Sequence, residues 1–145
     1  KRSVDSIHKE LGHIMWEHVG MGRTKEGLEE GLKLMKELRK EFETNLFIPG
    51  TKEGLNVELD KAIHLRDFIT MGELVAYDAL HREESCGGHF REEHQTEEGE
   101  AKRNDEEFFY VGCWEYQGSD EKAPELIKEP LEYEAIKVQT RNYKN

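Results

Sequence analysis

The sequence predicts a mainly α fold: an antiparallel three-helix bundle followed by a small two-stranded β ribbon and an irregular C-terminal segment. Two observations lead to this prediction. Apolar residues recur every three or four positions through most of the first 86 residues, which is the period of an amphipathic helix. An acidic stretch then leads into an aromatic, β-prone run. We therefore divide the single domain 1–145 into a helical bundle (1–86), an acidic loop (87–107) and a β ribbon with a tail (108–145).

The first helix is expected over residues 3 to 19. Ser3 or Asp5 can cap its N-terminus, because short polar side chains accept hydrogen bonds from the free amides of a first turn. Gly20 and Gly22 end the helix, since glycine accepts the left-handed conformation that often terminates one. The apolar stripe of this helix consists of Val4, Ile7, Leu11, Ile14, Met15 and Val19.

Two longer helices are expected to follow. Thr24 is a candidate N-cap for the second, which runs to about residue 46 before the loop at Pro49. Asn56 can cap the third, which is expected to continue to about Ser85. Short connections between long helices favour an antiparallel bundle. The residues expected to be buried in it are Leu11, Ile14, Leu28, Leu32, Met35, Leu38, Leu59, Ile63, Ile69 and Ala76.

The last 58 residues differ in pattern from the predicted bundle. Residues 91 to 107 are strongly acidic and are expected to form an exposed loop. Residues 108 to 116 are aromatic and favour a strand. A Gly-Ser-Asp turn follows, and Pro124 and Pro130 are expected to break the stretch after it. The alternating residues 131 to 140 are expected to form the second strand.

The composition of the chain argues against two classes of function, nucleic-acid binding and membrane insertion. The chain has 32 acidic and 21 basic residues, a net charge of −11, which disfavours nucleic acid because its phosphates need Lys and Arg. No apolar run approaches the roughly 20 residues of a membrane span, so we expect no direct membrane insertion. Hydrophobic residues make up 35% and charged residues 37%. The core is therefore expected to be narrow, with some apolar surface meeting a partner.

Candidate metal and catalytic residues lack the context that their chemistry needs. His81, Cys86, His89 and His94 include zinc-ligand types, but no second cysteine pair supports them. Ser85 or Cys86 with His89 has no nucleophile elbow or oxyanion hole. With only two cysteines, Cys86 and Cys113, we expect free thiols. We predict no catalytic, metal-binding or cofactor-binding residue in this chain.

The most informative stretch lies at the end of the third predicted helix. It resembles the R-x-E-S-R-G-x-H-x-R-x-D signature in the C-terminal domain of the flavoprotein subunit of succinate dehydrogenase and fumarate reductase. Cys86 stands where many members have arginine, and a thiol offers neither a cation nor a five-donor fork. The residues that carry the resemblance are Arg82, Glu84, Ser85, Cys86, Gly87, His89, Arg91 and Glu93.

Two further segments extend the resemblance over most of the chain. Arg103-Asn104-Asp105 before an aromatic strand fits the family's order. The opening helix and the turn after it are similar to the domain's V-G-x-x-R-x-x-x-G-L pattern, through Leu11, Met15, Trp16, Val19, Gly20, Arg23, Gly27 and Leu28.

The resemblance implies that the chain is a non-catalytic C-terminal domain fragment that packs against an FAD-binding region. It implies a parent oxidoreductase that interconverts succinate and fumarate. The fragment itself would hold no cofactor, and FAD would lie in the rest of the flavoprotein subunit. Electrons would pass to an iron–sulfur subunit and, at the membrane anchor, to a quinone. The parent would be peripheral on the cytoplasmic face of the bacterial inner membrane.

The contact with the rest of the parent is expected at the turn of the signature. Gly87 and Gly88 permit a sharp turn and a close approach to a neighbour. His89 and Arg91 supply directional donors, and Phe90 adds apolar area. The alternative is a helix stop whose polar groups pair only within the domain. The predicted contact residues are Glu84, Ser85, Gly87, Gly88, His89, Phe90 and Arg91.

Two other functions stay open. L-aspartate oxidase has a similar C-terminal domain, although the aromatic segment after the acidic loop favours the dehydrogenase. An independent helical protein-interaction module is the other alternative, because a bundle alone does not define a function.

Overall fold

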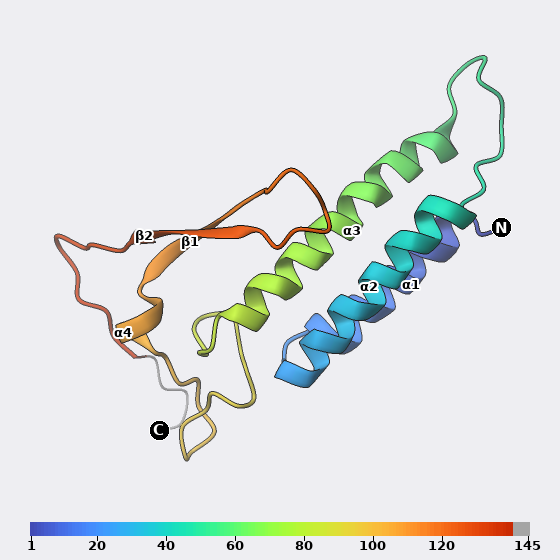
Figure 1. Ribbon diagram of the computed structural model, residues 1–145. Coiled ribbons are helices and arrows are strands. Elements are labelled where there is room, and N and C mark those ends of the chain that lie inside the picture. The colour runs from blue at the N-terminus through green and yellow to red at the C-terminus, as the bar shows by residue number, and fades with distance from the viewer. Residues whose placement is uncertain (141–145) are drawn as a thin grey trace.

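The computed structural model describes residues 1–140, and the last five residues of the predicted tail, 141–145, lie outside the described residues. Three long helices lie side by side, and a β ribbon extends from the end of the third (Figure 1). The elements, in order, are α1 (Val4–Val19), α2 (Lys25–Asn45), α3 (Val57–His81), α4 (Asp105–Phe108), β1 (Tyr110–Glu115) and β2 (Glu125–Pro130). The predicted bundle and the two-stranded ribbon are confirmed.

Local side-chain hydrogen bonds start each long helix where the sequence predicted. Ser3 Oγ caps α1 by accepting a hydrogen bond from the Ser6 amide at 3.2 Å. Thr24 Oγ1 caps α2 at 3.0 Å, and Asn56 Oδ1 caps α3 at 3.1 Å. Each bond satisfies one amide that has no partner within its helix.

Apolar side chains fill the space between the three helices. Gly72 lets α3 approach its neighbours closely, since a Cβ at this position would lie 3.2 Å from the Sδ atoms of both Met15 and Met35. Leu32, predicted to be buried, is half-buried at the edge of the core. The buried core consists of Val4, Ile7, Leu11, Ile14, Val19, Leu28, Met35, Leu38, Ala62, Leu65, Ile69, Ala76 and Ala79.

Two predictions about α3 are wrong. The helix ends at His81 instead of about Ser85, because the chain turns at Arg82, whose side chain reaches the backbone ahead of β1. Leu59 and Ile63 were predicted to be buried but are 46% and 48% exposed. Ala62 faces the core, and the next residue of an α-helix is rotated by about 100°, so Ile63 points to the flank.

The second strand was also misplaced. It covers Glu125–Pro130 rather than residues 131 to 140, and it pairs antiparallel with β1 from Tyr110↔Pro130 to Glu115↔Glu125. Proline was expected to break this stretch. In a two-stranded ribbon both strands are edges, however, and a proline at a strand end leaves no interior hydrogen bond unmade. The first strand begins later than predicted, because Asn104 caps the short helix α4 ahead of it.

The acidic segment after α3 follows a hydrogen-bonded path, although much of it is exposed as predicted. The Ser85 amide donates to the Lys102 carbonyl at 2.9 Å, and the Lys102 amide donates to the His94 carbonyl at 3.1 Å. Thr96 and Glu100 close a turn between them. The segment therefore folds back beside the end of α3.

Candidate functional site

The predicted contact segment forms a tight turn beyond α3. The Cys86 amide donates to the His89 carbonyl at 2.8 Å, and the His89 amide donates back to the Cys86 carbonyl at 3.0 Å. Gly87 has φ +60°, a left-handed conformation that glycine adopts without strain. Cys86, Gly87 and Gly88 are exposed, whereas His89 and Phe90 are half-buried. We call residues 86–89 the glycine turn.

Arg91 lies beneath the glycine turn and is only 2% exposed. Its Nη1 donates to the carbonyl oxygens of Ala79 and Leu80, at 2.9 and 3.1 Å. These carbonyls belong to the last turn of α3, where no amide is available within the helix. Its Nε donates to Glu93 at 3.1 Å. Arg91 is therefore the cation that closes the C-terminal end of α3.

Ser85 holds the two ends of the turn together. Its Oγ accepts a hydrogen bond from the Arg91 amide at 2.8 Å and donates to the Arg91 carbonyl at 3.1 Å. The residue is fully buried. A buried hydroxyl that both donates and accepts fixes the backbone opposite it.

Glu84 connects the turn to the ribbon. It is 3% exposed, and it accepts from Arg82 Nη1 at 3.0 Å and from the Asn104 amide at 2.9 Å. Arg82 also donates to the carbonyl oxygens of Phe108 and Tyr110. Its guanidinium lies 4.9 Å from the centre of the Tyr110 ring, within the range of a cation–π contact.

His89 is held as one neutral tautomer. Its Nε2 lies 2.8 Å from the Arg82 carbonyl, which only accepts, so Nε2 carries the proton. Nδ1 then accepts from Arg23 Nη1 at 2.9 Å. Burial lowers the pKa of His89, and the nearby charges of Arg23 and Arg91 lower it further. A second proton on the His89 ring would sit on Nδ1, where it would directly face the positively charged Arg23 guanidinium.

Arg23 joins the α1–α2 connection to the glycine turn. Its Nε donates to the Val19 and Gly20 carbonyls at the end of α1, at 3.3 and 3.1 Å. Its amide donates to the Phe90 carbonyl, and its carbonyl accepts from the Glu92 amide. Burial lowers the pKa of Arg23. Sequence reasoning gave Arg23 no role, although its place in the opening pattern was a signal.

The structure separates the predicted contact residues into two groups. Glu84, Ser85 and Arg91 are buried and pair within the domain. Gly87 and Gly88 stand at the exposed tip, where a Cβ would meet nothing within 4 Å. The arrangement is an exposed tip on a buried polar base. This base consists of charged, hydrogen-bonded side chains. It does not pair a nucleophile with a proton-accepting side chain, as nucleophilic catalysis would require.

Several other chemistries were sought in the described part of the chain. No group of three or more His, Cys, Asp or Glu side chains is placed to hold a metal ion there. Cys86 and Cys113 are free and exposed. Among residues 1–140, no helix combines the length and the apolar character that crossing a bilayer requires.

Comparison with known proteins identifies the family. Residues 8–143 match the model described as fumarate reductase flavoprotein C-term. The fumarate reductase flavoprotein subunit of Proteus vulgaris is 30% identical over 132 residues, which is 91% of this chain and 20% of that protein. The chain therefore belongs to the C-terminal domain family of the succinate dehydrogenase and fumarate reductase flavoproteins.

Two further likenesses define the limits of that assignment. The L-aspartate oxidase 2-a of Nicotiana tabacum is 38% identical over 92 residues, 61% of this chain and 14% of that protein. A solved quinol–fumarate reductase with menaquinol molecules superposes with a TM-score of 0.78 at 25% identity, covering 94% of this chain and 22% of that one. The chain thus spans between 14% and 22% of the length of these three proteins.

Proposed function

We propose that this chain is the non-catalytic C-terminal helical domain of a flavoprotein subunit that interconverts succinate and fumarate. In this proposal the domain packs against an FAD-binding region in the same subunit. Electrons leave the FAD for an iron–sulfur subunit and reach a quinone at a membrane anchor. The assembly is peripheral on the cytoplasmic face of a bacterial inner membrane. Membership of the family and the fold support this assignment.

The observation that carries the proposal is the exposed tip of the glycine turn on its buried base. Ser85 and Arg91 fix the backbone from below, so the tip keeps its shape without a partner. Gly87 and Gly88 present bare backbone, which lets a neighbouring chain approach closely. We propose that this tip, with His89 and Phe90 beside it, contacts the rest of the flavoprotein subunit.

Cys86 occupies a position on this tip where many family members have arginine. Its thiol is exposed and cannot supply a cation or a fork of donors to a partner. We therefore assign the contact to the shape and backbone groups of the glycine turn, and not to the side chain at position 86.

A bulky substitution tests the contact. Gly88→Trp adds a side chain where a Cβ meets nothing within 4 Å, so the chain alone should keep its melting temperature. The control is Thr51→Trp, which adds similar bulk at an exposed position in the α2–α3 loop. In the complete flavoprotein subunit, Gly88→Trp should lower FAD retention and succinate turnover, whereas Thr51→Trp should not. Equal behaviour of the two variants would show that the glycine turn is only a local helix stop.

The absence of catalysis by the chain alone is tested directly. The 145-residue chain, mixed with FAD and succinate, is expected to reduce a redox dye no faster than buffer. Turnover above that background would contradict the assignment of FAD chemistry to the rest of the subunit.

L-aspartate oxidase is the second candidate, and the 38% identity to the tobacco enzyme favours it. The complete subunit should oxidise succinate with a dye as electron acceptor and leave L-aspartate unchanged. Oxidation of L-aspartate would select this candidate instead. The reading frame upstream of Lys1 separates these candidates from the independent interaction module. If it encodes no flavin-binding β-α-β glycine motif, the interaction module is the function that is left.

A further inference from the structure

One side of the bundle, formed by α1 and α3, is apolar and exposed. The two helices meet there, with the centroids of the His8 and Phe68 rings 5.5 Å apart. Residues three and four positions apart share one face of a helix, so each helix contributes a row. Trp16 is 81% exposed, and the apolar residues of the α3 row are between 40% and 55% exposed. The residues of this α1–α3 face are His8, Gly12 and Trp16 of α1 and His64, Phe68, Met71 and Val75 of α3.

The α1–α3 face contains no Asp, Glu, Lys or Arg, although 37% of the residues of the chain are charged. The Asp5–Lys61 ion pair, at 3.4 Å, lies at one end of it. A helix side that faces water is ordinarily charged or polar. Aromatic and methionine side chains without charges are instead typical of the core of a protein interface. The composition therefore indicates a surface that is buried against a partner.

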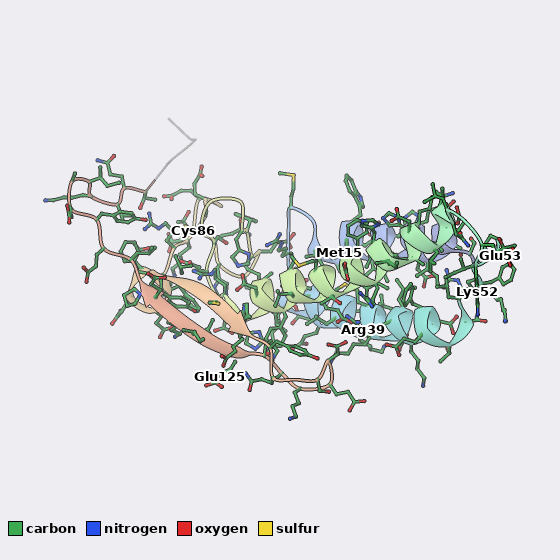
Figure 2. The ribbon with its side chains drawn as sticks, turned by 90° about the horizontal axis from the view of Figure 1, so that it is seen from above. Met15, Arg39, Lys52, Glu53, Cys86 and Glu125 are labelled. Atoms are coloured by element: carbon green, nitrogen blue, oxygen red, sulfur yellow. The ribbon has the colours of Figure 1, made fainter. Side chains whose placement is uncertain are left out.

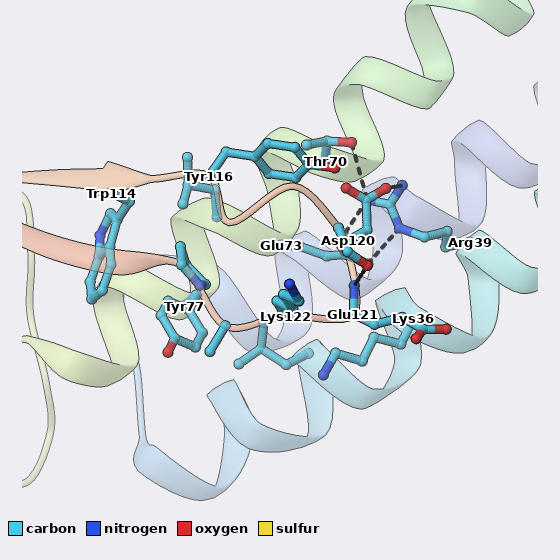
Figure 3. Close-up of a pocket in the computed structure, with 15 residues that line it drawn as sticks. Lys36, Arg39, Thr70, Glu73, Tyr77, Trp114, Tyr116, Asp120, Glu121 and Lys122 are labelled. Atoms are coloured by element: carbon cyan, nitrogen blue, oxygen red, sulfur yellow. Dashed lines mark hydrogen bonds and ion pairs between the residues drawn. The ribbon is translucent and has the colours of Figure 1, made fainter.

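The other two sides of the bundle differ from this face. Between α2 and α3, the loop after β1 lies across the helices, where Arg39 pairs with Glu73 at 2.7 Å and with Asp120 of the loop at 3.5 Å (Figure 3). Between α1 and α2, the surface is lined by charged residues, namely Glu10, Glu37, Lys40 and Glu41. In the part of the chain that the structure describes, the α1–α3 face has neither a covering loop nor charged side chains of its own.

Gly12 is an independent indication of close contact at this face. It lies in the middle of α1, where glycine destabilises a helix relative to alanine. A Cβ at this position would meet nothing within 4 Å, so packing within the domain does not require glycine. Gly31 differs, since a Cβ there would lie 2.8 Å from the Cβ of His18. Bare backbone on an exposed apolar face allows the backbone of a partner to approach closely.

We infer that the α1–α3 face is covered by an apolar segment of the FAD-binding region of the same polypeptide, whose backbone lies against α1 at Gly12. This inference rests on the proposed function. The chain covers 20% of the Proteus vulgaris subunit, so four-fifths of that protein lies outside this domain. A face without charges suits a permanent contact, because permanent interfaces are the more hydrophobic ones. A covalently attached region is also present at a high effective concentration.

The position of the face relative to the glycine turn supports the same occupant. Met21, which follows α1, is 91% exposed. It lies two residues before Arg23, whose side chain binds His89 of the glycine turn. The apolar surface of α1 thus leads to the glycine turn, and one partner can cover both.

Hydroxyl-radical labelling read by mass spectrometry tests this inference, because it reports the exposure of single side chains. Labelling of Trp16 and Met71 is compared between the 145-residue chain and the complete flavoprotein subunit. Both side chains should be labelled about fivefold more slowly in the subunit, since the core of an apolar interface excludes water. Leu55, which is 94% exposed in the α2–α3 loop, is the control and should be labelled equally in both.

Two substitutions test the face itself. In the subunit, Gly12→Arg should remove the protection of Trp16 and Met71, whereas His13→Arg, at the next exposed position of α1, should not. Gly12→Arg should not lower the melting temperature of the chain alone, because a Cβ at residue 12 meets nothing. Phe68→Glu repeats the test on α3. Its control is Ile63→Glu, which is equally exposed and lies about 140° away around the helix.

Succinate turnover by the same subunit reports the proposed function separately. Turnover by a subunit in which Trp16 and Met71 are labelled as fast as in the chain alone overturns this inference and leaves the proposed function in place. Protection without succinate turnover supports the contact and contradicts the proposed activity. Protection of the chain alone that rises with its concentration overturns the inference, because a second copy is then the occupant. Protection that survives both Gly12→Arg and Phe68→Glu overturns it as well.

Discussion

The bundle and the segment after it are stabilised by different interactions. Every buried hydrophobic side chain in the described residues lies in α1, α2 or α3. Between Glu92 and Thr140, no described residue is buried. In Figure 2 the ribbon lies along one side of the helices, and the labelled Glu125 projects outward beside the bundle. The bundle is therefore held by apolar burial, and the ribbon by polar and aromatic contacts at its attachment to α3.

The glycine turn lies between these two regions and uses a third kind of interaction. Glu84, Ser85 and Arg91 are buried polar residues whose partners come from both sides. A buried polar group is stabilising only when its hydrogen bonds are made. No buried side-chain nitrogen or oxygen lacks a partner in the described part of the chain. The difference between the regions predicts how each responds to mutation.

The largest effect is expected in the bundle core. Leu38 is 1% exposed, so Leu38→Ala should lower the free energy of unfolding by about 2–5 kcal/mol through lost burial and a cavity. The matched control is Ile63→Ala on α3, where the side chain is 48% exposed and the loss should be about 1 kcal/mol or less. Urea unfolding measures both. Equal losses would contradict the core assignment.

The second-largest loss of stability is expected at the buried residues beneath the glycine turn. Ser85→Ala leaves the buried Arg91 amide without its partner, whereas the Arg91 carbonyl keeps its hydrogen bond from the His94 amide, so the cost should be about 1–3 kcal/mol. Ser119→Ala removes a hydroxyl that accepts one bond from Glu121 in an exposed turn, so it should cost about 0.5 kcal/mol or less. Chemical denaturation compares them, and a neutral Ser85→Ala would show that the base is not required.

The ribbon should detach without unfolding the bundle. Trp114→Phe removes the indole bond to Asp78 at a local cost of about 0.5–1.5 kcal/mol. Amides of β1 and β2 should then exchange hydrogen faster, while α1–α3 amides keep their protection. Trp16→Phe, at an 81% exposed position, should change neither. Faster exchange throughout α3 would mean that ribbon and bundle form one cooperative unit.

The smallest effect is a pH dependence at the glycine turn. The pKa of His89 is lowered in the folded chain, so the unfolded chain binds a proton first as the pH falls. The stability contributed by His89 is therefore present above its ordinary pKa of about 6.5 and is lost as the pH falls below it. His89→Gln keeps a donor for the Arg82 carbonyl and an acceptor for Arg23 but does not titrate. Unfolding free energies at about pH 7.5 and about pH 5.5 should differ less in this variant; an unchanged difference would exclude His89 as the cause.

The sequence by itself determined the class of fold, the helix starts and the family. Ser3, Thr24 and Asn56 act on amides three residues away, so local sequence was sufficient to place the starts of the three long helices. The spacing of apolar residues by three and four positions identified most of the core, because this pattern is also contained within each helix. The signature around His89 led to the family through its residues alone.

Tertiary structure decided which residues support the glycine turn and which strands pair. Arg23 and His89 are 66 residues apart in the chain, and no local pattern states that one binds the other. Leu59 and Ile63 follow the helical period but lie on a flank that neither neighbouring helix covers. The second strand is set by its pairing with β1, which residues 125–130 satisfy despite the proline at their end. Local propensities act over a few residues, whereas burial and strand pairing depend on where distant segments meet.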